Sequence, residues 1–343
     1  MIRRNTRIGL AVFAAFATLS CSSEERLKLI VAVPSHSVSK LPFVMAMDQD
    51  LYAKHGLAVE LWLPPPGGGG TKVHGDLWTR FLRATGIGTP EEPDITFDGA
   101  TPKIVELTQT GGAERLIAIG ANDCAVRAHI ITRPGIAKIE DLKGQRIGVS
   151  AMRATQGFVA LLLAQRMGWD PVKDISILVD ADELEDLAAG RVDAIIGSEP
   201  DYAAAVQQGL PILTDMREWD EPLGGNSINV RPEWLEVPMH REAARRFLMA
   251  TAEAIAMLHQ QPEIALAVMD DWFGIEDPRY AELYLSRAAW TPRKPYPCVD
   301  GIVKTMELYD SHEMRKYKAE DFYDDSILRE IDASGFIDGL YKK

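Results

Sequence analysis

The sequence predicts an α/β fold built on open, doubly wound sheets, in a chain long enough for two domains. The chain has 343 residues, of which 46% are hydrophobic and 25% charged, and this is ordinary globular composition. Short β-branched apolar runs alternate with segments of helical periodicity along most of its length. Glycines follow several of the predicted helices, as is typical where a helix ends before the next strand.

The start of the chain has the layout of a secretory signal, so we expect it to lie outside the fold. Three arginines among the first seven residues precede the apolar run Ile8–Leu19, which is too short for a comfortable membrane span. Ser20 and Cys21 follow and resemble a bacterial lipobox. We expect residues 1–20 to be a signal peptide and Cys21 to carry a lipid anchor. An ordinary signal peptide with an incidental cysteine is the alternative.

The first folded segment predicts a strand, a helix and a second strand, the order of a parallel β-α-β unit. Leu27–Val33 is an apolar, β-branched run, Leu41–His55 has helical periodicity, and Leu57–Leu63 is a second apolar run. Prolines and glycines then break all regularity. We expect a long loop over Pro64–Pro93, with a short helix at Gly75–Arg83.

The middle of the chain repeats this alternation, and the last hundred residues are mostly helical in pattern. We predict strands at 94–97, 115–120, 128–132, 146–149, 175–179, 192–196 and from 212, and helices at 103–108, 155–167, 182–189 and 201–208. Repeated strand–helix units of this kind favour an open, doubly wound sheet.

Ligands of open α/β sheets bind beyond the carboxyl ends of the strands, and this rule selects five loops. The candidate ligand-binding residues in these loops are Ser35, His36, Asp98, Gly99, Thr101, Arg153, Thr155, Gln156, Glu199 and Asn226. Each has a structural alternative. His36 could be a solvated loop residue, Thr101 could cap the helix that follows it, and Glu199 could belong to the cap of a helix.

The loop from Ser150 to Gln156 is the strongest of the five. It leads from a strand into a helix start, where free N–H groups and the helix dipole favour an anionic group. Arg153 adds a positive charge and a bidentate fork. Asp98 and Glu199 favour instead a cation or a hydroxylated ligand, and a zwitterion satisfies both kinds of site. A surface arginine beside an ordinary cap is the alternative for Arg153.

The sequence carries none of the common catalytic or metal-binding motifs. It has no Gly-x-Ser-x-Gly elbow, no phosphate-binding loop and no His-Glu-x-x-His, and its seven histidines are scattered. We therefore expect no enzyme activity, no cofactor and no metal. The net charge of −13 disfavours nucleic acid as a partner, because acidic proteins repel phosphate backbones.

Cys124 and Cys298 are the only cysteines after Cys21. An oxidising compartment permits a disulfide between them, but their spacing in the sequence gives no geometric reason for one. We expect two separate buried thiols.

Several stretches resemble the nitrate/sulfonate/taurine-type solute-binding proteins of ABC transporters, a family that also includes binders of pyrimidine precursors. The stretches that carry this resemblance are Gln49–Glu60, Ile139–Val149, Ala189–Ile196 and Phe322–Ser326. The third of them reads Ala-Gly-Arg-Val-Asp-Ala-Ile-Ile, and the second contains Asp-Leu-Lys-Gly before Ile-Gly-Val. The chain departs from the family over Pro64–Pro93, where about thirty additional residues intervene.

The resemblance implies the type II fold of periplasmic binding proteins, with two lobes, two crossing segments and a ligand cleft between the lobes. One lobe is expected to comprise residues 26–122 plus 224–343, and the other residues 123–223. The family implies a monomer in the periplasm or cell envelope that delivers a small-molecule ligand to an ABC permease. A sensor, a partner of another kind of transporter, and an enzyme resembling pyrimidine-precursor synthases are the alternatives.

Overall fold

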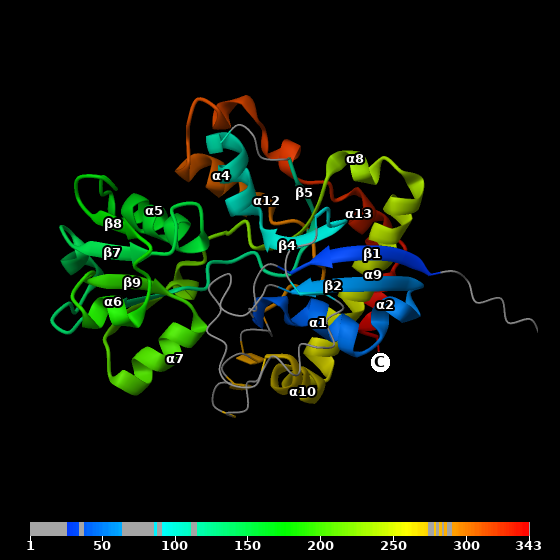
Figure 1. Ribbon diagram of the computed structural model, residues 1–343, viewed down its shortest axis with the longest axis horizontal. Coiled ribbons are helices and arrows are strands. Elements are labelled where there is room, and N and C mark those ends of the chain that lie inside the picture. The colour runs from blue at the N-terminus through cyan, green and yellow to red at the C-terminus, as the bar shows by residue number, and fades with distance from the viewer. Residues whose placement is uncertain are drawn as a thin grey trace, which may run out of the picture.

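The computed structural model describes residues 26–33, 38–63, 86–87, 91–110, 115–273, 278, 281–282, 285–286 and 290–342. The predicted signal peptide with Cys21, the residues Ser35 and His36, and the predicted helix Gly75–Arg83 lie outside this range. Within it the chain forms two separate β-sheets flanked by helices, and Figure 1 shows the two sheets side by side along the long axis.

The first sheet has six strands in the order β3-β2-β1-β4-β11-β5. Their bounds are β1 (Leu27–Ala32), β2 (Leu57–Leu63), β3 (Gly86–Ile87), β4 (Ile95–Gly99), β5 (Ile117–Ala121) and β11 (Asn226–Val230). The strands from β3 to β4 are mutually parallel. β11 returns from the second sheet and lies antiparallel between β4 and β5, with Asn226 opposite Gly99.

The second sheet has five strands in the order β10-β6-β9-β7-β8. Their bounds are β6 (His129–Thr132), β7 (Arg146–Val149), β8 (Ser176–Val179), β9 (Ala194–Gly197) and β10 (Ile212–Asp215). β7 is parallel to β8 and β9, whereas β6 is antiparallel to β9 and β10. The predicted α/β class is confirmed, with the strands divided between two mixed sheets.

Helices cover both sheets and supply most of the second half of the chain. The α-helices are α1 (Leu41–Asp48), α2 (Leu51–Lys54), α4 (Ala100–Thr110), α5 (Thr155–Met167), α6 (Leu184–Ala188), α7 (Glu199–Gln208), α8 (Pro232–Leu235), α9 (Pro238–Gln260), α10 (Pro262–Phe273), α12 (Val299–Leu308), α13 (Ser326–Ala333) and α14 (Phe336–Leu340). The predicted single helix Leu41–His55 is wrong, because Asp50 has a left-handed backbone (φ 54°) that separates α1 from α2.

Two extended segments connect the sheets and pair with each other. Ala125 and Pro222 form an antiparallel bridge. The Val126 amide donates to the Glu221 carbonyl at 3.1 Å, and the Leu223 amide donates to the Cys124 carbonyl at 3.0 Å. We call these two connections the crossing segments. The exact division into lobes stays a prediction.

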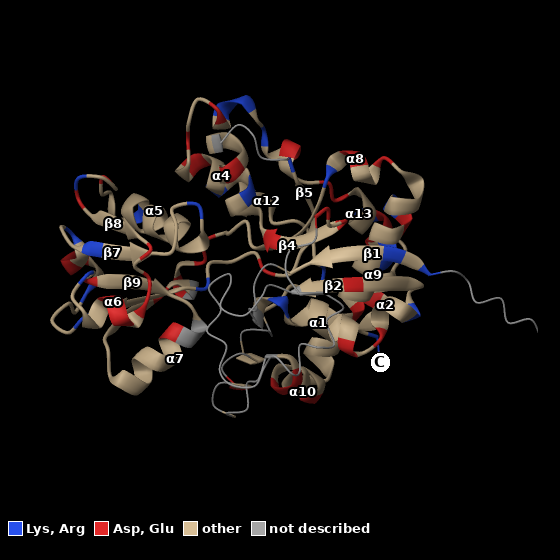
Figure 2. Ribbon diagram, viewed as in Figure 1, with Lys and Arg blue, Asp and Glu red and all other residues tan. Residues whose placement is uncertain are grey.

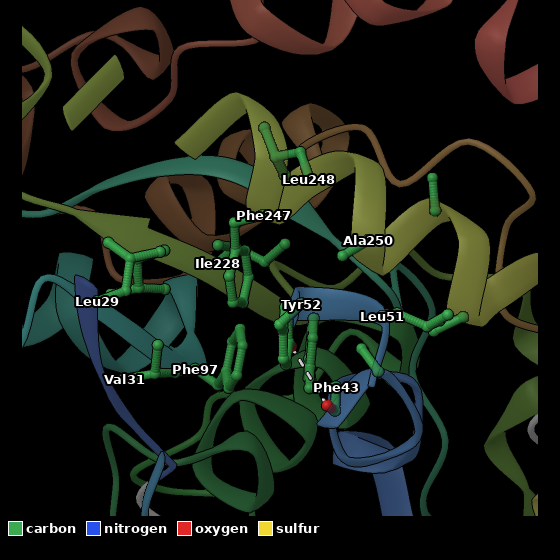
Figure 3. Close-up of a cluster of buried hydrophobic side chains, with 14 of the residues drawn as sticks. Leu29, Val31, Phe43, Leu51, Tyr52, Phe97, Ile228, Phe247, Leu248 and Ala250 are labelled. Atoms are coloured by element: carbon green, nitrogen blue, oxygen red, sulfur yellow. Dashed lines mark hydrogen bonds between the residues drawn. The ribbon is translucent and has the colours of Figure 1, made fainter. Parts of the chain in front are cut away.

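The core of the first sheet fixes the position of α1. Leu41, Phe43 and Met45 are fully buried, and Phe43 stacks on Phe97 of β4. Figure 3 shows these rings beside Phe247 of α9, with the Tyr52 hydroxyl donating to the Phe43 carbonyl at 3.2 Å. α1 therefore packs between β4 and α9, and Lys40 directly precedes it.

Cys124 and Cys298 form a disulfide, so the expectation of two separate thiols is wrong. Their Cα atoms are 5.2 Å apart, although 174 positions separate the cysteines in the sequence. The reason is the tertiary fold, which brings the connection after β5, where Cys124 lies, beside Cys298 at the start of α12. The disulfide therefore ties one of the two connections to the start of α12.

Two glycines let the crossings and α12 approach each other closely. A Cβ atom on Gly225 would lie 1.3 Å from the Asp123 carbonyl oxygen, and one on Gly301 would lie 2.0 Å from the Leu223 carbonyl carbon. Only glycine fits such contacts without moving the backbone. Together with the disulfide, they pack both crossing segments against the start of α12.

Charged residues are interspersed over both lobes, as Figure 2 shows for Lys and Arg beside Asp and Glu. None of the described helices combines the length and apolarity needed to span a bilayer.

Candidate functional site

Five polar residues gather at one edge of the first sheet, and we call them the Lys40 cluster: Lys40, Asp98, Asn122, Asp123 and Asn226. Asp98 lies near the end of β4, Asn122 follows β5, Asn226 begins β11, and Lys40 directly precedes α1. Figure 1 shows that β1 and β4 point toward the second sheet, so this edge is the one that faces it. It is also the edge where α/β sheets bind ligands.

Lys40 is the central residue of this cluster. Its side chain is 2% exposed, and its Nζ donates to Asn226 Oδ1 at 2.5 Å. Burial lowers the pKa of Lys40 to about 8, while the carboxylates of Asp98 and Asp123 act in the opposite direction. The ammonium is therefore still charged at neutral pH, in surroundings that solvate it poorly.

The two carboxylates of the cluster already have cationic partners. Lys103 Nζ lies 3.4 Å from Asp98 Oδ2, and Arg127 Nε lies 3.0 Å from Asp123 Oδ1. Lys40 has no ion pair within 4 Å among the described residues. The charge of Lys40 is thus balanced only at longer range.

Asn122 has a buried acceptor that no described group satisfies. The residue is 2% exposed, and its Nδ2 donates to the Ser39 carbonyl at 2.5 Å. Its Oδ1 has no hydrogen-bond partner among the described residues. Rotating the amide would place its oxygen against the Ser39 carbonyl and leave Nδ2 unpaired, so the observed orientation is the better one.

Of the predicted candidates in the first lobe, Asp98 and Asn226 belong to the cluster. Gly99 is the last residue of β4, and a Cβ there would lie 2.9 Å from Pro102 Cδ and 3.5 Å from the Gly225 carbonyl oxygen. Thr101 is 1% exposed, and its hydroxyl lies 2.7 Å from that of Thr305 on α12. The Thr101 side chain thus joins α4 to α12.

The predicted candidates of the second lobe lie at the starts of α5 and α7. Arg153 and Thr155 are exposed, and Gln156 Oε1 accepts from the Ser150 hydroxyl at 2.9 Å. Glu199 begins α7, whose start is capped by Ser198 and Asp201. The Glu199 side chain lies outside the described part of the structure. Among the described contacts, none joins these residues to the Lys40 cluster.

One contact does link the α5 loop to the first lobe. The Tyr309 hydroxyl, just after α12, donates to the Met152 carbonyl at 2.5 Å. Arg166 of α5 also lies 3.2 Å from Glu221 of the crossing segment. The loop that contains Arg153 is therefore held near the junction of the lobes on the α12 side.

Sequence reasoning did not select Lys40, Asn122 or Asp123. Asn122 and Asp123 follow a predicted strand, so the carboxyl-end rule could have found them. Lys40 precedes an apolar helix and looks like a solvated helix end. In the fold its Nζ donates to Asn226, which is 186 positions away. No pattern in the sequence reveals that contact.

Other site types have less support in the described part of the chain. No three His, Cys, Asp or Glu side chains there are close enough to hold a metal ion. A pocket of about 550 Å³ lies on α12, lined in part by Val303, Met306 and Met314. None of its lining residues belongs to the Lys40 cluster, and the charged residues Asp310 and Arg315 in its lining form an ion pair with each other.

Comparison with known proteins supports the resemblance found in the sequence. Residues 128–265 match the protein family described as NMT1/THI5 like. No curated protein matches the chain. Solved structures do match it, including three at 14–19% sequence identity.

The nitrate-binding protein NrtA from Synechocystis PCC 6803 superposes with a TM-score of 0.65 at 14% identity, covering 93% of this chain and 92% of NrtA. The aliphatic sulphonate-binding protein SsuA from Escherichia coli gives 0.58 at 19% identity, covering 84% and 86%. One similar structure is an enzyme, the desulfurization enzyme DSZB, with 0.59 at 14% identity, covering 90% and 99%.

These matches confirm the expected resemblance at two levels. The family match runs from β6 to the first residues of α10. The structural matches cover 84–93% of the chain. The chain therefore carries an NMT1/THI5-like segment at 128–265 within the fold shared by periplasmic nitrate- and sulphonate-binding proteins.

Proposed function

We propose that the chain is an extracytoplasmic solute-binding protein that delivers a small organic solute to an ABC-type importer. The solute binds between the two lobes, which close over it by bending at the two crossing segments. The observation that carries this proposal is the Lys40 cluster. It places a buried ammonium with unused donors at the sheet edge that faces the other lobe.

The disulfide supports a location outside the cytoplasm. Structural disulfides persist in oxidising compartments and are rare in the cytosol. The arginine-rich start and apolar run of the sequence favour export on independent grounds. Similar structures named as periplasmic binding proteins agree with both.

Solute binding is tested with protein purified under native conditions. Native mass spectrometry is expected to find a co-purified small molecule, and small-angle X-ray scattering is expected to give a smaller radius of gyration when that molecule is returned to stripped protein. A protein that binds no small molecule and keeps one radius of gyration throughout contradicts the proposal.

The proposed lipid anchor predicts a change in partition. In cells that process bacterial lipoproteins, Cys21→Ser is expected to move the protein from the membrane fraction to the soluble fraction, because a thioether-linked lipid cannot form on serine. The measurement is immunoblotting of the two fractions. Equal membrane partition of wild type and variant removes the anchor from the proposal and leaves solute binding intact.

The second candidate function is catalysis on the same fold, which the similarity to DSZB favours. Incubating stripped protein with the identified solute separates the two functions. A binding protein returns the solute unchanged, whereas an enzyme produces a new mass in multiple turnovers. Recovery of the intact solute is the result expected here.

A further inference from the structure

We propose that the Lys40 cluster recognises a small organic acid that carries an N–H or O–H donor close to its acid group. Lys40 Nζ donates to the oxyanion, and Asn122 Oδ1 accepts from the adjacent donor of the solute. This inference rests on the proposed solute-binding function and specifies the chemistry of its ligand.

Lys40 requires an acceptor that the described residues do not supply. A lysine ammonium has three N–H donors, and the one described hydrogen bond of Lys40 goes to Asn226. A buried charge is costly unless it is paired and hydrogen-bonded. Asp98 and Asp123 have partners of their own in Lys103 and Arg127. The group that best satisfies Lys40 is therefore an anion with several acceptor oxygens, such as a carboxylate or sulfonate.

Asn122 requires the opposite kind of group. Its buried Oδ1 has no described donor, while its Nδ2 is fixed by the Ser39 carbonyl. Buried polar atoms in folded proteins almost always have a partner, and an unsatisfied one marks a place where a ligand or water belongs. An ammonium, amine or hydroxyl group of the solute supplies the missing donor.

The two unsatisfied groups belong to one small region. Asn122 bonds to the carbonyl of Ser39, the residue that precedes Lys40. The backbone N–H of Asn122 also donates to the backbone carbonyl of Asn226 at 3.1 Å, and the Asn226 side chain accepts a hydrogen bond from Lys40 Nζ. Three hydrogen bonds thus join Asn122, Asn226 and the adjacent residues Ser39 and Lys40. A small solute whose acid and donor groups are a few bonds apart can therefore contact both Lys40 Nζ and Asn122 Oδ1.

An acidic ligand gives the affinity a defined pH dependence. The pKa of Lys40 is about 8 without ligand, set by burial and opposed by Asp98 and Asp123. Binding an oxyanion favours the charged ammonium, so binding takes up a proton once the pH exceeds that value. The other charged groups of this region are the ion pairs that Asp98 forms with Lys103 and Asp123 with Arg127. We expect the affinity to be constant from pH 6 to 7 and to fall by up to about tenfold per pH unit above pH 8.

Isothermal titration calorimetry with matched solutes tests the proposal. The carboxylate arm is 3-aminopropionate, 3-hydroxypropionate and propionate, and the sulfonate arm is 3-aminopropane-1-sulfonate and propane-1-sulfonate. Propylamine carries the donor alone. In at least one arm, wild-type protein is expected to bind the acid that carries a donor and to bind its donor-free analogue about tenfold more weakly. It is expected not to bind propylamine.

Variants assign the two roles. Lys40→Met is expected to weaken binding of the acid by about 100-fold, because it removes a buried charged donor. Asn122→Leu is expected to abolish the preference for the donor-bearing acid. Lys173→Met is the matched control, since Lys173 is an exposed lysine of the second lobe, and it is expected to bind as wild type. Melting curves of the unliganded variants report whether each is folded.

The pH profile of wild-type protein gives a readout that needs no variant. Unchanged affinity in Lys40→Met, a preserved donor preference in Asn122→Leu, or a flat profile up to pH 9.5 overturns this inference. Binding of propylamine or a neutral solute by the wild-type protein, without binding of any acid, also overturns this inference. In that case the proposed solute-binding function stands.

Discussion

Replacing both Cys124 and Cys298 by serine is expected to lower the free energy of unfolding by up to about 5 kcal/mol. The disulfide closes a loop of 174 positions, and the entropy that a cross-link removes from the unfolded chain grows with the length of the loop. The bond also holds a crossing segment against the start of α12. Urea unfolding followed by circular dichroism measures the loss as a lower midpoint.

Reducing agent provides the control for the disulfide. Wild-type protein in a thiol reductant is expected to unfold at the midpoint of the double serine variant, and the variant itself is expected to be insensitive to reductant. A midpoint shift worth less than about 1 kcal/mol contradicts the account, because disulfides over long loops ordinarily contribute about 2–4 kcal/mol.

Gly225→Ala is expected to destabilise the protein by about 3 kcal/mol or more, by forcing the two crossing segments apart. The added Cβ would lie 1.3 Å from the Asp123 carbonyl oxygen, and a backbone atom cannot rotate away as the end of a side chain can. The movement also displaces Asn226 and Asp123, so weaker solute binding is expected from the protein that remains folded.

Gly339→Ala is the matched control for that substitution. Gly339 lies in α14, and no atom outside its own neighbourhood is within 4 Å of an added Cβ. Alanine has the higher helix propensity, so the variant is expected to be neutral or more stable by up to about 1 kcal/mol. Equal midpoints for the two alanine variants in urea would falsify the assigned packing at Gly225.

The sequence predicts the fold well because the spacing of apolar residues differs between strands and helices. The alternation from Leu27 onward and the glycine after α5 follow directly from local pattern. The break between α1 and α2 does not, since Asp50 adopts a left-handed backbone that sequence pattern favours only weakly for aspartate. The predicted helix was continuous for that reason.

The candidate site is less predictable, because its residues meet only through the tertiary fold. The rule of carboxyl ends selects Asp98, near the end of β4, and the five selected loops also include Asn226, at the start of β11. Lys40 and Asn226 are 186 positions apart, and Cys124 and Cys298 are 174 apart. Both contacts are made by the return of β11 and the crossing segments to the first sheet. Neither leaves a local signal in the sequence.

The position of the bound solute tests the central claim most directly. A crystal structure of the protein with the solute that co-purifies with it is expected to show that molecule between the two sheets, with an acid oxygen within about 3 Å of Lys40 Nζ and a donor facing Asn122 Oδ1. A solute bound elsewhere, or one that leaves both Lys40 and Asn122 without contact, contradicts the account.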